Sequence, residues 1–319
     1  MALLTPIYDE YLQTAMVEAL VQNINVLNEA SAGAITFGVE DIIGDFDFST
    51  EYGQITDLVK RRDITSNAGV TPDNLSLIEN IKVLADYRMR ASENWENFKR
   101  RGRSEEDLIQ VVGKQFAEQL IQRYLNLGIG ALVNAVDVNG FKNATLNTST
   151  AGVTHLLKAE ELYAEHYNDI AAFIMHSNDF HALRRDEVEN FKLDTVGGLT
   201  VVQGATASLG RPLIVTNAPA LRFDAGASDF KGRILACKRG AINLVERAGR
   251  KVLIDESAAG ENINKTFAVD GSIQFSLGGY AYTAGTRSPT DAALQTGANW
   301  TALYDNVMTG ACIVETDHV

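Results

Sequence analysis

Residues 81–90 read IKVLADYRMR, and this short stretch decides the fold that the sequence predicts. Apolar and polar side chains alternate along it, which is the period-two pattern of a strand that buries one face. Residues 44–65, GDFDFSTEYGQITDLVKRRDIT, alternate in the same way until Gly53 shifts the phase, as a β-bulge would. A polar, turn-rich stretch at 66–76 separates the two. The sequence therefore predicts a long two-stranded β-hairpin within residues 40–92.

The predicted hairpin needs a cover for its apolar face, because an isolated hairpin is marginally stable in water. Either the body of the protein or another chain supplies that cover. Basic clusters lie on the first arm (KRR, 60–62) and just after the second (KRRGR, 99–103). They are either ordinary solvated charges or ion-pair partners for an acidic neighbour. If another chain covers the hairpin, the contact residues that we expect are Phe46, Phe48, Tyr52, Lys60, Arg61, Arg62, Tyr87, Arg88, Arg90, Arg100 and Arg101.

One amphipathic helix is predicted before the hairpin and another after it. Residues 8–29 carry apolar side chains at helical spacing from Leu12 to Leu27, which fits an ordinary packed helix or an arm that lies on a neighbouring subunit. Ser104 opens a longer helix, with acidic residues in its first turn that favour the helix dipole. If this helix continues to residue 134, its ~30 residues span roughly 45 Å.

The second half of the chain predicts a compact α+β unit over residues 154–259, with a buried strand at 169–176 followed by a helix. Residues 265–283 then predict an antiparallel strand pair that turns at Asp270-Gly271. The closing stretch is SPTDAALQTGANWTALYDN (288–306), followed by an apolar run.

This closing stretch predicts a short capped helix and an anchor. Pro289 favours a helix start, with Thr290 or Asp291 available as its cap, and Gly297 can end the helix in the left-handed conformation. Trp300 offers a large apolar anchor. The final run ACIVET (311–316) can add a strand and close the same domain that the long helix belongs to.

Composition limits the classes of function. The chain has 319 residues, is 45% apolar and carries a formal net charge of −13, which disfavours nonspecific attraction to nucleic acid or anionic membranes but permits a protein that encloses DNA. Its two cysteines, Cys237 and Cys312, predict buried free thiols and a reducing, cytoplasmic site of assembly. We expect no signal peptide and no membrane span, because no run reaches the roughly 18 apolar residues that a membrane helix needs.

Catalytic motifs are weak. His176 and His181 are five residues apart, so they do not share a helical face as zinc ligands would. The glycine-rich segment 197–210 lacks the Gly-Lys-Ser/Thr of a phosphate-binding loop. We therefore expect no catalytic, cofactor or metal site, and keep an α+β hydrolase or transferase only as a distant alternative.

The order of these parts resembles the major capsid proteins of tailed bacteriophages with the Hong Kong 97-type fold. LVKRRDIT (58–65) is similar to the basic arm of their extended loops, and IMHSNDFHALRR (174–185) to a strand-then-helix entry common among them. SPTDAALQTGANWTAL (288–303) resembles the Asn-Pro-Thr-Asp ending of one subgroup. Here Ser288 replaces the usual Asn, and Tyr282 stands where many relatives have Trp.

The resemblance implies an α+β fold divided as in these capsid proteins. Residues 1–39 would form the N-terminal arm, 40–92 the extended β-hairpin loop and 154–259 the axial domain. Residues 93–153 and 260–319 would form the peripheral domain, with the spine helix at 104–134.

The resemblance also implies function by assembly. Copies would form hexamers and pentamers of an icosahedral virion capsid around double-stranded phage DNA, assembled in the bacterial cytoplasm without a cofactor. Because no room remains before the long helix for the N-terminal assembly domain of some relatives, we expect a separate scaffolding protein, besides a portal protein and, in some phages, a decoration protein. In some relatives a loop lysine is linked covalently to a neighbour's asparagine, and Lys60 and Lys82 lie in the corresponding element.

The alternative with the same fold is an encapsulin-like compartment that encloses cargo enzymes. A peptide-binding groove formed by the N-terminal helix would favour it, whereas the phage-like C-terminal stretch argues against it.

Overall fold

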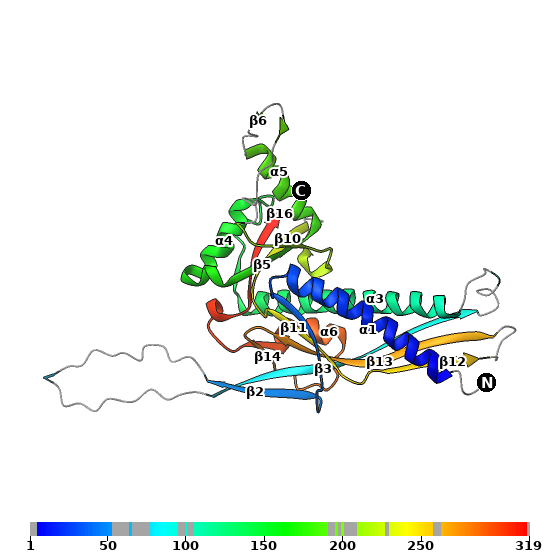
Figure 1. Cartoon of the computed structure of the whole chain (residues 1–319). Helices are drawn as coiled ribbons and strands as arrows, with labels where there is room; N and C mark the ends of the chain where they lie inside the picture. The colour runs from blue at the N-terminus through cyan, green and yellow to red at the C-terminus, as the bar shows by residue number, and fades with distance from the viewer. Residues whose placement is uncertain are drawn as a thin grey trace.

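The computed structural model describes residues 5–52, 64–65, 77–94, 100, 105–190, 195–196, 199–200, 209–226, 230–257 and 263–317. Two β-sheets organise these residues into a mixed α+β fold (Figure 1). The long helix α3 (Glu105–Asn139) contacts strands of both sheets, so it connects the two halves of the molecule.

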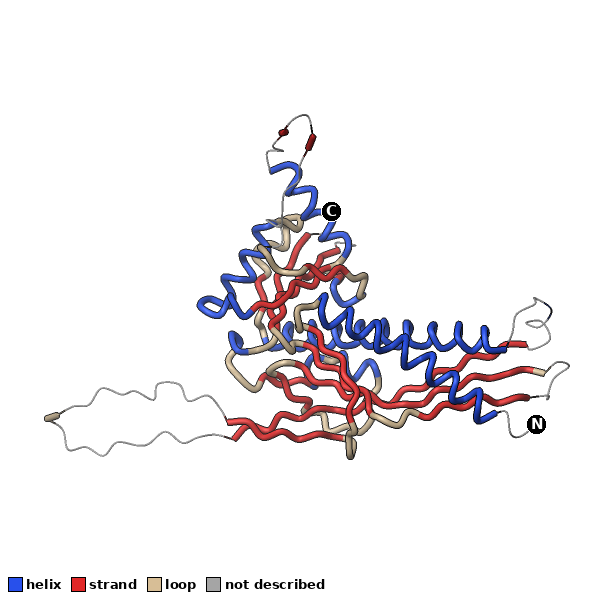
Figure 2. The backbone as a smooth tube through the Cα atoms, in the orientation of Figure 1, coloured by secondary structure: helices blue, strands red, loops and turns tan. Residues whose placement is uncertain are grey.

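The larger sheet has eight strands. They are β1 (Ile35–Glu40), β2 (Phe46–Tyr52), β3 (Leu77–Asn94), β11 (Ile242–Arg247), β12 (Lys251–Ser257), β13 (Asn264–Leu277), β14 (Tyr280–Tyr282) and β15 (Trp300–Ala302). The order along the main path is β1-β11-β13-β14-β15, with β12 and β3 also paired to β13 and β2 paired to β3. β13 is therefore the organising strand. β2 and the start of β3 project to one side, whereas the end of β3, β12 and β13 extend to the other (Figure 2).

β3 contains the deciding stretch, and its two halves have different partners. Leu77–Val83 pairs antiparallel with β2, and Val83–Asn94 pairs antiparallel with β13. The predicted alternation is confirmed, because Val83, Ala85 and Tyr87 are buried while Asp86 and Arg88 are exposed. The predicted hairpin is confirmed where Leu77–Val83 pairs with β2. It is wrong for residues 84–92, since β13 supplies the backbone partners there and α3 supplies apolar cover, with the Tyr87 and Tyr124 rings 5.7 Å apart.

The smaller sheet has six strands. They are β4 (Lys142–Asn143), β5 (Ile170–Met175), β8 (Leu213–Val215), β9 (Arg222–Asp224), β10 (Phe230–Lys238) and β16 (Ala311–Asp317). Their order is β4-β16-β10-β5-β8, with β9 on β10. Helices α4 (Val153–Tyr163) and α5 (Ser177–Asn190) belong to this half, with a short pair, β6 (Thr195–Val196) and β7 (Leu199–Thr200), beyond α5.

The last strand, β16, lies between β4 and β10 in the six-stranded sheet. It therefore adds a strand to an existing sheet, as predicted, and that sheet is the six-stranded one; β16 also contacts α3. The neighbouring strands β10 and β11 separate, one into each sheet, so the chain changes sheet near Gly240 and not at the predicted boundary near 259. Gly240 has φ +68°, and its N–H donates to the Gly33 carbonyl at 2.7 Å, which directs the following strand to β1.

No turn forms at Asp270-Gly271, so that prediction is wrong as well. β13 continues through both residues. A Cβ added to Gly271 would lie 2.5 Å from the Tyr87 hydroxyl, so the glycine makes room for a ring. The chain instead turns at Gly278 and Gly279, the latter with φ +75°, on its way to β14.

Helix α1 (Thr5–Ala30) packs alongside α3 (Figure 1). Leu12, Met16 and Leu20 on its predicted apolar face are buried. A Cβ on Gly113 of α3 would lie 3.1 Å from that of Ala15, which indicates how closely the helices approach. This face therefore packs within the subunit, as the ordinary-helix interpretation expects. The predicted spine helix is confirmed and continues past residue 134 to Asn139.

The closing stretch forms α6 (Asp291–Gln295), capped by the Thr290 hydroxyl, which accepts from the Ala293 N–H at 3.3 Å. Trp300 is the predicted anchor: it is buried, and its Nε1–H donates to the Leu294 carbonyl at 2.8 Å. Gly297 is not left-handed; it lies against the Asn134 backbone with no room for a side chain. Ser288 has φ +44°, a conformation that Asn adopts more readily.

Short 3₁₀ turns complete the described chain. They are η1 (Ala164–Asp169), η2 (Pro219–Leu221), η3 (Gly297–Asn299) and η4 (Asn306–Met308).

Candidate assembly surfaces

An apolar stripe leaves the core along the β2–β3 ribbon. In the antiparallel register Phe46 lies opposite Val83 and Phe48 lies opposite Ile81, so these side chains share one face. Exposure rises along this face: Val83 is fully buried and Phe46 half-buried, whereas Phe48 is 61% exposed and Leu77 is 65% exposed. The subunit covers the base of the stripe and leaves its outer part open to water.

On the polar face of the ribbon an ion pair links the two strands. Lys82 Nζ lies 3.0 Å from Asp47 Oδ2, and Lys82 holds the pKa of that carboxyl below its usual value by hydrogen bonding and charge. Lys82, one of the two lysines considered for a covalent link, is therefore engaged within its own subunit.

Two of the predicted contact residues are engaged within the subunit. The Tyr87 hydroxyl is buried and donates to Glu246 Oε1 at 2.6 Å, so Tyr87 is an interior residue and its prediction as a surface contact is corrected. Arg88 makes two hydrogen bonds of 2.6 Å to the Asp270 carboxylate across the β3–β13 pair. That pairing lowers the pKa of Asp270.

The other predicted contact residues are exposed or undescribed. Arg90 and Arg100 are exposed. Four positions lie outside the described residues, namely Lys60, Arg61, Arg62 and Arg101. For Tyr52 only the backbone is described.

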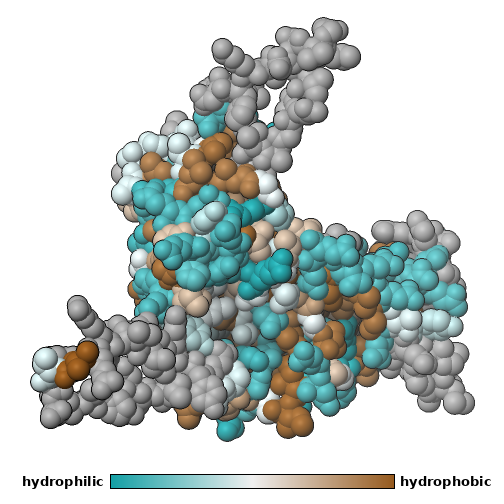
Figure 3. Space-filling view, turned by 60° about the vertical axis from the view of Figure 1, so that its left-hand side comes forward, coloured by the Kyte–Doolittle hydropathy of each residue, from teal (hydrophilic) through white to brown (hydrophobic). Residues whose placement is uncertain are grey.

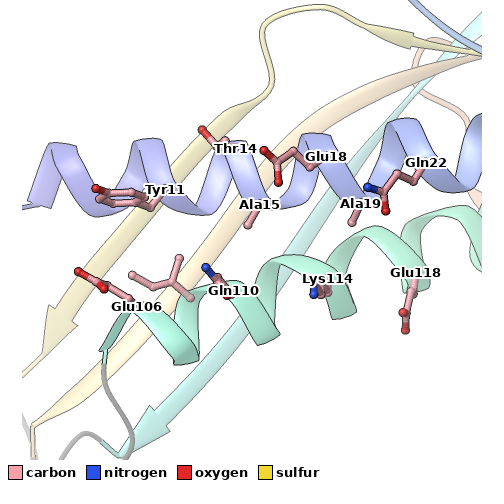
Figure 4. A pocket seen from close by; sticks show the side chains of 11 residues that line it. Tyr11, Thr14, Ala15, Glu18, Ala19, Gln22, Glu106, Gln110, Lys114 and Glu118 are labelled. Carbon is pink, nitrogen blue, oxygen red and sulfur yellow. The ribbon is translucent and has the colours of Figure 1, made fainter.

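A groove of about 600 Å³ runs between α1 and α3 (Figure 4). Its charged lining is Glu18, Glu106 and Glu118 with Lys114, so carboxylates outnumber ammonium groups. The sequence predicted both helices but not this acidic groove, since the facing register of two helices is not contained in their separate periodicities. It lies on the N-terminal helix, where the compartment alternative expects a peptide site.

A second hollow, of about 650 Å³, lies at the β11–β12 turn and is rich in cations. The cations that line it are Arg88, Arg247, Arg250 and Lys251. Beneath them Glu246 is fully buried, and its Oε2 accepts from Arg250 Nη2 at 2.7 Å. Burial raises the pKa of Glu246, opposed by the charge of Arg250 and by the Tyr87 hydroxyl. Three of these cations lie within the five residues RAGRK (247–251), a local signal that was not used, whereas Arg88 joins them only through strand pairing.

Apolar side chains also gather in patches on the upper and lower parts of the face in Figure 3, between polar areas. Large exposed apolar side chains are found in both halves, for example Leu157 on α4 and Val138 on α3. A large contiguous apolar patch is typical of a surface that binds a protein, a membrane or a ligand, whereas single exposed apolar side chains are ordinary.

The residues considered for chemistry have structural roles where they are described. His176 Nδ1 accepts from the Asn178 N–H at 3.2 Å and so satisfies a backbone donor at the start of α5. Burial raises the pKa of the Cys237 thiol to about 12, and Cys312 is likewise a buried free thiol. Within the described ranges, no group of three or more His, Cys, Asp or Glu side chains is placed to hold a metal, and no helix is long and apolar enough to cross a bilayer.

Comparisons with known proteins agree with this fold. The profile of the family described as major capsid protein 13-like matches residues 5–314. A search of curated protein sequences gave no match.

Solved structures of low sequence identity share the fold. One is the capsid of Ralstonia phage GP4, with 12% identity, coverage of 91% of this chain and 88% of that chain, and a TM-score of 0.57. Mycobacterium phage Cain gives 13% identity, 91% and 90% coverage, and a TM-score of 0.56. The cyanophage Pam1 capsid gives 10% identity, 89% and 88% coverage, and a TM-score of 0.55.

Proposed function

The chain belongs to the major capsid protein 13-like family, and from that premise we propose how its surfaces build the shell. It is a phage major capsid protein with the Hong Kong 97-type fold, and its copies assemble with one another in the capsid. The family match carries this conclusion, because it extends over residues 5–314 and so includes both sheets and the long helix.

The assembled form that we propose is a closed icosahedral shell of hexamers and pentamers around double-stranded DNA. The net charge of −13 supports a wall that encloses DNA without binding it tightly. Closure requires heterologous contacts, in which one surface of a subunit meets a different surface of the next. The bacterial cytoplasm remains our proposal for the place of assembly.

The β2–β3 ribbon is our proposed main contact. Phe48 and Leu77 are large, apolar and more than half exposed. Phe48 continues a stripe that is buried at its base, and Leu77 lies on the same face beyond the polar Thr50–Glu79 pair. Covering such side chains contributes about 25 cal/mol per Å² of apolar surface removed from water. Arg90 and Arg100, both exposed, are proposed to lie at subunit contacts together with Lys60, Arg61, Arg62 and Arg101.

The division of the chain is also a proposal. The eight-stranded sheet with α1 and α3 would be the peripheral domain, and the six-stranded sheet with α4 and α5 the axial domain. The predicted N-terminal arm, residues 1–39, would add α1 and β1 to the peripheral domain, and the outer part of the extended loop at 40–92 would reach neighbouring subunits. Strand pairing supports this division, with β11 and β12 moved to the first domain and β16 to the second.

Other partners follow from the resemblance. We propose a separate scaffolding protein, a portal protein and a decoration protein as partners, and a structural rather than enzymatic role. The cargo-compartment alternative is not favoured, because the matched family is one of major capsid proteins.

Electron microscopy of the purified chain, expressed alone and with the phage genes upstream of it, tests this proposal. Uniform shells or ordered sheets of subunits are the expected result. A soluble monomer under both conditions would contradict it.

A further inference from the structure

The cation-rich hollow at the β11–β12 turn contains an arginine with an unused hydrogen-bonding group. The Arg250 side chain is only 8% exposed. Its Nη2 donates to Glu246, but its Nη1 is buried and has no hydrogen-bond partner among the described residues. A buried polar group without a partner carries a desolvation cost, so such groups are usually satisfied by a protein, water or ligand atom.

Each carboxylate in the hollow already accepts a hydrogen bond from another group, and no described carboxylate lies within hydrogen-bonding distance of Arg250 Nη1. Asp270 is held by both hydrogen bonds from Arg88, and Asp86 accepts from the Ser272 hydroxyl at 2.6 Å. Glu246 already accepts from Tyr87 and from Arg250 itself. No described residue of the subunit supplies this acceptor, so a group from another molecule can supply it.

The charges around the hollow leave one positive charge in excess. Four cations line it, namely Arg88, Arg247, Arg250 and Lys251. Three carboxylates oppose them, namely Asp86 and Asp270 in the lining and Glu246 beneath it. Four minus three leaves one, which a single carboxylate neutralises.

We propose that a carboxylate of a second copy of the chain enters this hollow and accepts a hydrogen bond from Arg250 Nη1, between Arg247 and Lys251. This inference rests on the proposed assembly function, which brings copies into contact. Arg247 and Lys251 are exposed, and their long side chains can close around the incoming group.

A neighbouring subunit fits the hollow better than DNA does. Each copy carries 41 acidic residues against 28 basic ones, so carboxylates are abundant on every adjacent copy. The single excess positive charge of the hollow matches one carboxylate, whereas Asp86 and Asp270 repel a polyanion more strongly than a single charge. A single guanidinium edge matches one carboxylate group and not a continuous phosphate backbone.

Charge reversal at the rim tests the inference without disturbing the buried pair. The double variant Arg247→Glu/Lys251→Glu is expected to lower the yield of shells by at least about tenfold, because a repelled contact is repeated in every subunit. The matched control is Arg184→Glu/Arg185→Glu, two exposed arginines on α5. It is expected to assemble like the unmodified chain, and both variants should unfold at the same urea midpoint as that chain. Normal shell yield from the rim variant overturns the inference.

A reconstruction of shells of the unmodified chain gives the second measurement. A carboxylate oxygen of a neighbouring copy within about 3 Å of Arg250 Nη1 is the expected result. A hollow that faces only solvent or DNA phosphates in those shells overturns the inference while leaving the assembly function intact. Failure of the unmodified chain to form shells would instead count against the proposed function.

Discussion

Strands β3 and β13 lie side by side, with Tyr87 opposite Gly271, and the Tyr87 side chain also contacts Glu246 of β11. The Tyr87 ring lies over Gly271, where any Cβ would collide with it, and its hydroxyl satisfies the buried Glu246 carboxylate at 2.6 Å. A buried carboxylate is tolerated only when it is paired and hydrogen-bonded. The period-two pattern correctly predicted the face on which Tyr87 lies, but not that its own chain covers that face.

Replacing Gly271 with Ala tests this packing. The added methyl group would meet the Tyr87 hydroxyl, so we expect the free energy of unfolding of the unassembled chain to fall by about 1–3 kcal/mol. Gly38→Ala is the matched control, because an added Cβ there meets nothing within 4 Å and its φ is not positive. Urea unfolding followed by circular dichroism measures both, and equal midpoints for the two variants would contradict the account.

His155 predicts a pH dependence of stability. Its ring is buried and its Nδ1 accepts from the Gly152 N–H at 3.2 Å, and burial lowers the pKa of the imidazole. The unfolded chain then binds the proton more readily than the folded chain, so stability falls as the pH drops from 7 through about 6.5 and below.

We expect the urea midpoint of the unassembled chain to fall between pH 7 and pH 5. In His155→Asn that fall should be smaller, because the group that titrates has been removed. An equal fall in both chains would show that another group is responsible.

At the scale of elements, the spacing of apolar residues predicted which helices and strands form. It predicted less well which elements pack against one another. The four-residue spacing from Leu108 to Leu127 correctly predicted a long helix, and α3 continues beyond it. Gly128 and Gly130 lie inside this helix, where glycine is unfavourable by about 1 kcal/mol relative to Ala. Gly128 packs against Ile242, where a Cβ would lie 2.8 Å from Cγ2, so the glycine serves close packing.

The prediction of a turn at Asp270-Gly271 was also wrong because of tertiary contacts. The dipeptide is typical of a hairpin turn, yet β3 and β12 pair with β13 on both sides of it. Tertiary pairing overrides a local turn preference, and a single sequence does not contain the positions of those partners.

A charge placed on the exposed apolar face of the β2–β3 ribbon tests whether that face is a subunit contact. Phe48→Asp places a charge on the exposed apolar stripe and should abolish shell formation without changing the urea midpoint of the monomer. Ser49→Asp places the same charge on the opposite face of the same strand and should permit assembly. Sedimentation velocity of both purified variants measures the outcome. Shells from Phe48→Asp at the normal yield would argue against the ribbon as a contact.

At the scale of the whole molecule, the chain passes between its two sheets more often than the sequence indicates. β10 and β11 are nearly continuous in sequence but lie in different sheets, and β16 returns to the sheet that β4 and β5 began. Such pairings depend on contacts between residues far apart in the chain, which local periodicity does not report. The order of parts was nevertheless enough to identify the capsid fold, because that order is specific even where each motif is weak.

The candidate surfaces were only partly predictable for the same reason. Alternation identified the ribbon stripe with Phe46 and Phe48. The acidic groove between α1 and α3 depends on tertiary contacts and gave no local signal. The hollow around Arg250 had a partial one, the basic run RAGRK at 247–251, but its contact with Arg88 and Asp270 depends on tertiary pairing.

A reconstruction of assembled shells of the unmodified chain at side-chain resolution tests the central claim most directly. The account predicts that Phe48 and Leu77 of each subunit lie within about 4.5 Å of apolar side chains from a neighbouring copy. Shells in which both side chains face solvent in every subunit would contradict it.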